Sequence, residues 1–267
     1  MKRVAAVGIA LVLFFSAMSV RADLQILEGQ HYARAPQEIA DNPLVKEVGK
    51  GPGEIHVLEF FSYGCAGCYK LDPLIETWRS KLPPNVTFQR VPVEFHTEWR
   101  NLTKAYFTAL NLKVMDKIHG PFFEAIHTNK ITSSSDDTIR QFFVSQGVPQ
   151  KDFDQEYDSF SLNRKQKWAG NITRAYHVTA VPAIIVQGPK GIFVTTARLA
   201  GSQENMIATL EHLIKIEKGE VQASVAPDAV VPAQAEPATT NTTTQTTPAP
   251  TKTSALQKIL AYFKTRN

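Results

Sequence analysis

Two cysteines, Cys65 and Cys68, are the only cysteines in this chain of 267 residues, and two residues separate them. They follow an almost continuously apolar run at 55–61 and begin a segment with helical character. In the first turn of a helix, backbone N–H groups lack partners and the helix dipole is positive, which favours a thiolate at Cys65. Cys68 lies one turn later, where a disulfide is feasible and the helix covers the sulfur. We therefore expect an exposed, acidified Cys65 that meets a substrate and a Cys68 that resolves the intermediate.

Three other interpretations compete for this cysteine pair. A structural disulfide would close a very short loop and would gain little stability. A metal site needs at least two further ligands; His177 is one candidate, but there is no second C-x-x-C motif. Haem attachment needs a histidine directly after the second cysteine, and it is excluded because that residue is Tyr69.

Two further features lie near the cysteines in the expected fold. Glu59 interrupts the apolar run before Cys65, and a carboxylate inside a buried strand must be protonated or hydrogen-bonded. Glu59 is thus a candidate proton relay with Arg90 as a candidate partner, the alternatives being a solvated strand end and a surface arginine. Pro182 comes directly before an apolar stretch, which is consistent with an edge or loop position. Only a small fraction of the peptide bonds that precede a proline are cis.

The elements that must position these residues form a β-α-β pattern, then helices, then strands and one helix. In chain order we expect a strand at 55–61, a helix at 66–81, a parallel strand at 86–91, mostly helices at 98–176, strands at 182–186 and 192–195, and a helix at 203–217. Within the helical stretch, breaks are expected near Gly120–Pro121, 132–135 and 147–149.

Both ends of the chain differ from this central region. Residues 1–22 have a basic start, a short apolar core and a Val-x-Ala end, typical of a secretory signal peptide cleaved after Ala22; an uncleaved anchor is the alternative. The mature chain would then form one domain at 23–220. Residues 221–254 are rich in Thr and Pro and are expected to be a disordered linker. Residues 255–267 carry an apolar stripe at helical spacing, which indicates a short helix that either docks on its own domain or contacts a membrane surface or a partner.

Composition narrows the class of protein. Hydrophobic residues make up 43% and charged residues 20%, as in ordinary globular chains, which excludes a wholly disordered or collagen-like protein. The net charge is +4, but Lys2, Arg3 and Arg21 lie in the expected signal peptide, so the remainder carries 26 basic against 25 acidic residues. We therefore expect no nucleic-acid partner.

The stretch Leu58-Glu-Phe-Phe-Ser-Tyr-Gly-Cys65-x-x-Cys68-Tyr69, the long helical region and Ala180-Val-Pro182-Ala together resemble the DsbA family of thiol:disulfide oxidoreductases. The resemblance implies an α/β thioredoxin fold with a helical insertion at about 98–176. It makes Cys65 the nucleophile and Cys68 the resolving cysteine, Pro182 a cis-proline facing them, Glu59 the buried acid beneath them, and Val181 a backbone contact for an extended substrate.

The resemblance also implies a function. We expect a periplasmic enzyme that introduces disulfides into reduced exported polypeptides and is reoxidised by a DsbB-like membrane oxidase, with no cofactor and no metal ion. The best-known members have Pro-His between the cysteines, whereas this chain has Ala66-Gly67, so Cys65 should be less acidified and the disulfide less oxidising. A disulfide isomerase or reductase of the same fold is one alternative. A redox-inactive peptide-binding or chaperone-like module is the other.

Overall fold

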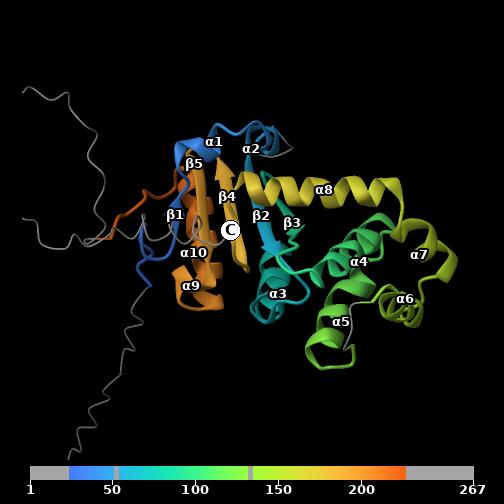
Figure 1. The fold of residues 1–267 in the computed structure, drawn as a ribbon. Coiled ribbons are helices and arrows are strands. Elements are labelled where there is room, and N and C mark those ends of the chain that lie inside the picture. Colours follow the sequence, from blue (N-terminus) through green and yellow to red (C-terminus); the bar gives the residue numbers. More distant parts are fainter. Residues whose placement is uncertain (1–23, 51–53, 132–134, 227–267) are drawn as a thin grey trace, which may run out of the picture.

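A five-stranded sheet forms the centre of the fold in a computed structural model, which describes residues 24–50, 54–131 and 135–226 (Figure 1). The strand order is β1-β5-β4-β2-β3, with β1 at Ala33–Arg34, β2 at Ile55–Phe61, β3 at Val86–Pro92, β4 at Ala183–Gly188 and β5 at Gly191–Thr196. β2 and β3 are parallel, whereas β4 runs antiparallel to both β2 and β5. The parallel pairing of the two strands that flank the cysteine helix confirms the β-α-β prediction.

Helices cover both faces of the sheet. They are α1 (Gln37–Ala40), α2 (Pro43–Val48), α3 (Ala66–Arg79), α4 (Trp99–Asn111), α5 (Met115–His127), α6 (Asp136–Ser145), α7 (Gln150–Tyr157), α8 (Phe160–Ala175), α9 (Ala197–Ala200) and α10 (Gln203–Lys218). One core lies between the sheet and α3 with α10, and includes Leu71, Trp78 and Leu210. The other packs the opposite face and the inserted helices, and includes Leu58 and Ile172. All seven residues of β2 are buried because both cores use this strand.

The helices between β3 and β4 form the predicted insertion, which lies to one side of the sheet and is joined back to it by α8 (Figure 1). The predicted break at Gly120–Pro121 is wrong, because α5 continues through both residues. Pro121 and Lys117, the residue four positions earlier whose carbonyl loses its helix partner, both lie on the exposed face, where this carbonyl is not forced to stay unpaired in a dry core. Ile118 and Phe122 meanwhile pack at i and i+4 on the buried face.

The actual break in this region separates α4 from α5 at Lys113, which has a positive φ of 59°. The break expected at 147–149 is confirmed, with Gly147 at φ 83° between α6 and α7. A further break before α8 was not expected from the sequence; there the Ser159 hydroxyl accepts a hydrogen bond from the Leu162 amide at 3.1 Å.

The two ends of the described chain meet beside β1. Glu28 N donates to Ser224 O at 2.8 Å and Ala226 N donates to Glu28 O at 3.1 Å, so the ordered domain continues beyond 220 to Ala226. The expected signal peptide, most of the expected linker and the expected helix at 255–267 lie outside the described residues. Within the part of the chain that is described, no helix combines the length and apolarity needed to cross a bilayer.

A candidate redox site at the start of helix α3

The end of β2 and the start of α3 place the two cysteines. Cys65 is the N-cap residue of α3, with extended φ and ψ angles of −96° and 112°, and its Sγ accepts a hydrogen bond from the Cys68 amide at 3.1 Å. A tight turn delivers the chain to this point, since Cys65 N donates to Ser62 O at 3.0 Å and Gly64 N donates to the Ser62 hydroxyl at 3.1 Å. Because Cys65 is the N-cap residue, its sulfur accepts from a backbone N–H that has no partner within the helix, as the sequence predicted.

Both cysteines are free thiols and both are buried. Cys68 is 0% exposed and Cys65 is 9% exposed, so the prediction of an exposed Cys65 is wrong. Val181 and Pro182 cover it: the Val181 carbonyl oxygen lies 3.6 Å from Cys65 Sγ, where it accepts a hydrogen bond from the protonated thiol. Cys65 is therefore the less deeply buried of the two cysteines, and the segment at Val181–Pro182 lies against it.

The surroundings separate the acidities of the two thiols. The hydrogen bond from the Cys68 thiol lowers the pKa of Cys65; burial opposes this, and the backbone amides of Cys68 and Gly67 add to it. Burial raises the pKa of Cys68 well above its ordinary value, and the negative charge of a Cys65 thiolate raises it further. In the reduced site Cys65 is thus the more acidic of the two thiols, and the Cys68 thiol is the donor that stabilises its ionised form.

The segment before β4 lies against this pair. The Val181–Pro182 peptide bond is cis. A Cβ atom built on Gly67 would lie 3.1 Å from Pro182 Cδ and 3.8 Å from Cys65 Sγ, so the proline ring packs directly on the turn between the cysteines. Pairing of Ala183 in β4 with Phe60 in β2 brings these distant segments together.

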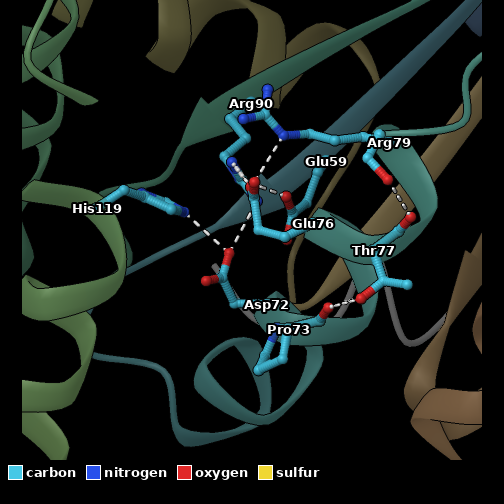
Figure 2. A network of polar contacts seen from close by, with 9 residues as sticks. Glu59, Asp72, Pro73, Glu76, Thr77, Arg79, Arg90 and His119 are labelled. Atoms are coloured by element: carbon cyan, nitrogen blue, oxygen red, sulfur yellow. Dashed lines mark hydrogen bonds and ion pairs between the residues drawn. The ribbon is translucent and has the colours of Figure 1, made fainter. Parts of the chain in front are cut away.

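Glu59 belongs to a buried ionic cluster whose common partner is Arg90 (Figure 2). It is 1% exposed, so the alternative of a solvated strand end is wrong. Arg90 is its partner in the sheet register, and Arg90 Nε lies 2.8 Å from Glu59 Oε2. The guanidinium also lies 2.8 Å from an oxygen of Asp72 and 2.8 Å from an oxygen of Glu76, both on α3.

Burial raises the pKa of Glu59, although the charge of Arg90 opposes the shift. Burial would also raise the pKa of Asp72, but a hydrogen bond from His119 and the charge of Arg90 bring it below its usual value. The negative charge of Glu59 in turn raises the pKa of both cysteines. The cluster is therefore electrostatically coupled to the sulfur atoms of Cys65 and Cys68.

Donor atoms of Asp72, Glu76 and His119 all lie within 4.8 Å of one another, a spacing compatible with a metal ion. The Arg90 guanidinium is itself a cation and already bonds both carboxylates. The site is therefore an ionic cluster and does not fit a metal. His177, considered as a ligand beside the cysteines, instead lies 3.8 Å from the Glu38 carboxylate.

Helices of the insertion also hold the turn before Cys65, and the sequence did not predict this. His127 Nε2 donates to the Tyr63 carbonyl at 2.8 Å, and its ring stacks on Tyr69 with centroids 4.7 Å apart. His119 Nδ1 lies 2.8 Å from the Tyr63 hydroxyl. The indole of Trp99 covers Gly64 so closely that a Cβ atom there would clash with it. Nothing in the sequence signalled these contacts; of the other site residues that the sequence analysis missed, only Asp72 and Glu76 carried a signal, through their i, i+4 spacing along a helix.

Comparisons with known proteins agree with this geometry. A family model described as a DSBA-like thioredoxin domain matches residues 56–206. The thiol:disulfide interchange protein DsbA of Azotobacter vinelandii is 30% identical over 197 residues, which cover 74% of this chain and 86% of that protein. The protein of the same name from Bordetella pertussis is 34% identical over 151 residues, covering 57% and 70%.

Solved structures give the same result. The crystal structure of Pseudomonas aeruginosa DsbA aligns with a TM-score of 0.64 and 29% identity, covering 73% of this chain and 96% of that one. A structure of Proteus mirabilis DsbA with a non-covalently bound peptide aligns with a TM-score of 0.55 and 25% identity, covering 71% and 96%. The predicted thioredoxin fold with a helical insertion is thereby confirmed.

Proposed function

Because this chain belongs to the DsbA-like thioredoxin domain family and is a thiol:disulfide oxidoreductase, we propose that it oxidises dithiols of exported polypeptides through Cys65 and Cys68. The observation that carries the proposal is the asymmetry of the pair. Cys65 Sγ sits at a helix N-terminus with a lowered pKa, whereas Cys68 is fully buried with a raised pKa. A thiolate that is stabilised in the reduced enzyme makes the disulfide a good oxidant.

The reaction begins with Cys65 and Cys68 joined as a disulfide. A client thiolate attacks Cys65 Sγ, the bond between the cysteines breaks, and its electron pair leaves on Cys68, which takes up a proton. The second client thiolate then attacks the client sulfur of this mixed disulfide and expels Cys65 as a thiolate. The client loses two electrons and gains a disulfide, and the enzyme becomes a dithiol.

The backbone beside Cys65 is suited to hold the client. Val181 lies directly before the cis-proline, and its carbonyl is 3.6 Å from Cys65 Sγ. An extended client segment lying along Val181 would place its own sulfur against Cys65. The peptide complex of the related Proteus mirabilis protein fits such a role.

We also propose the setting in which this chemistry occurs. Residues 1–22 act as a signal peptide that exports the chain to the periplasm, where a DsbB-like membrane oxidase restores the disulfide. Residues 255–267 make a weak contact with a membrane surface or a second subunit through Leu256, Ile259, Leu260 and Phe263.

The redox state of the pair in cells tests the direction of the reaction. Acid quenching and alkylation of free thiols should show Cys65 and Cys68 mainly oxidised if the enzyme is an oxidase. A mainly reduced pair would indicate the isomerase or reductase that the Ala66–Gly67 dipeptide also permits. Cellular disulfide formation that is unchanged when both cysteines are replaced would contradict either enzyme.

Gly67→His should make the disulfide more oxidising. The new Cβ would lie 3.8 Å from Cys65 Sγ and 3.1 Å from Pro182 Cδ, so the imidazole fits near the sulfur after a small shift of the proline ring. A hydrogen bond or positive charge from this ring should lower the pKa of Cys65 and shift the equilibrium with glutathione toward the reduced enzyme by about tenfold. Thiolate absorbance against pH measures the shift, and Gly67→Ala is the steric control. An unchanged pKa in Gly67→His would contradict this explanation.

A further inference from the structure

His119 bridges two groups that belong to different parts of the site. Its Nδ1 lies 2.8 Å from the hydroxyl of Tyr63, two residues before Cys65, and its Nε2 lies 2.9 Å from Asp72 Oδ1. The ring is 6% exposed and projects from α5 toward the ionic cluster (Figure 2). An ionised carboxylate only accepts hydrogen bonds, so Nε2 carries a hydrogen. In the neutral ring Nδ1 then accepts a hydrogen bond from the Tyr63 hydroxyl.

The charges around this imidazole do not balance while it is neutral. Three carboxylates, Glu59, Asp72 and Glu76, face the guanidinium of Arg90. Arg79 adds one further positive charge, with Nε 2.9 Å from Glu76 Oε2. With every group ionised, three negative charges meet two positive charges, and one negative charge is in excess. Protonation of His119 would cancel it.

This excess charge acts on the cysteines through Glu59. Its negative charge raises the pKa of Cys65, and Asp72 and Arg90 in turn shift the pKa of Glu59 in opposite directions. Any group that fixes how Asp72 and Glu59 share Arg90 therefore affects the stability of the Cys65 thiolate.

We propose that His119 is a positioning residue for the thiol–disulfide reaction, which holds Asp72 on Arg90 and thereby sets the net charge beneath the cysteines. The proposal rests on Cys65 and Cys68 being the redox pair. With the neutral ring the cluster keeps its excess negative charge, and with the protonated ring it is balanced. Acid should therefore stabilise the Cys65 thiolate relative to a protein that lacks this imidazole, and make the disulfide more oxidising.

The groups that face His119 define where this change occurs. Burial lowers the pKa of His119; the hydrogen bond to Asp72 opposes the shift, and the charge of Arg90 adds to it. Two further groups face His119 from other elements. The Tyr63 hydroxyl bonds its Nδ1, and the ring of Tyr106 on α4 lies with its centroid 6.4 Å from that of His119. His119 therefore takes up its proton at a pH below the ordinary histidine pKa of about 6.5.

The test compares His119→Gln with the wild type and with His127→Gln in the full chain. His127 is a matched control because it also lies on α5 and bonds Tyr63, but it bonds the backbone carbonyl and not a carboxylate of the cluster. The equilibrium constant with glutathione is measured from pH 7.5 down to about pH 5. Below about pH 6.5 the wild type and His127→Gln should become about threefold more oxidising relative to His119→Gln. The expected effect is modest because the charge on His119 acts on Cys65 only through the ionic cluster and is partly compensated there.

Three results would count against the role of His119. Superimposable pH profiles of His119→Gln and the wild type would overturn it, and so would an equal change in His127→Gln. A wild-type His119 ring that shows no titration by NMR in this range would also overturn it. If His119→Gln does not fold, Asp72→Asn replaces it, because loss of the counter-ion should move the NMR titration of His119 to lower pH. Absence of any exchange between wild-type Cys65–Cys68 and glutathione would instead contradict the proposed function itself.

Discussion

Cys65→Ser should abolish oxidation of client dithiols, whereas Cys68→Ser should accumulate long-lived mixed disulfides with clients. Cys65 is 9% exposed and has a lowered pKa, so we expect it to be the sulfur that a client reaches. Cys68 is 0% exposed and lies one helical turn inside α3, so it reaches only Cys65. Without Cys68, an adduct on Cys65 loses the internal thiol that would displace it.

The measurement is non-reducing electrophoresis of each variant after incubation with a reduced client, together with the rate of client oxidation. The double serine variant is the control, because it keeps the peptide surface around Val181 and removes both sulfurs. Client oxidation by Cys65→Ser above the rate of this control, or adducts that form through Cys68, would reverse the assigned roles.

The sequence predicted those features of the site that follow from strand register and helix position. A buried apolar run placed β2, the cysteines marked the start of α3, and parallel pairing made Arg90 a reasonable partner for Glu59. The exposure of Cys65 was predicted wrongly because its cover comes from Val181, 116 positions later in the chain. A single helix gives no information about which distant loop lies across its first turn.

The inserted helices show a similar limit. Their existence was predictable from periodicity, but their approach to the active-site turn was not. His119 and His127 lie on one face of α5, and only the packing of α5 against α3 and the Tyr63 turn brings them to the site. Gly120–Pro121 was wrongly predicted to break α5 because local propensity was weighed without the buried neighbours that hold the helix together.

Arg90→Met should produce the largest loss of stability that we expect from a single substitution near the site. The guanidinium is the common partner of Glu59, Asp72 and Glu76, and its side chain is 5% exposed. Methionine keeps much of the volume but leaves the carboxylates without their central counter-ion. Removing one partner of a buried ionic group costs about 3–5 kcal/mol in the free energy of unfolding at pH 7. Urea unfolding measures this loss.

Arg79→Met is the matched control, since this arginine pairs with Glu76 at 2.9 Å but its side chain is 43% exposed. Its loss should be at most about 1 kcal/mol, as for surface ion pairs. A comparable loss in both variants would show that Arg90 acts through packing or general charge and not as the centre of the cluster.

The pH dependence of the Arg90→Met deficit follows from the directions of the pKa shifts. In the wild type the pKa of Asp72 is below its unfolded value, so its contribution is present above about pH 4 and is lost as pH falls through the folded value. In the variant, buried carboxylates without Arg90 should have raised pKa values and should take up protons in mild acid, which relieves their repulsion. The difference in unfolding free energy between wild type and variant should therefore shrink between pH 7 and pH 5. A deficit that stays constant over this range would mean that the carboxylates remain compensated without Arg90, and would contradict a cluster organised around its charge.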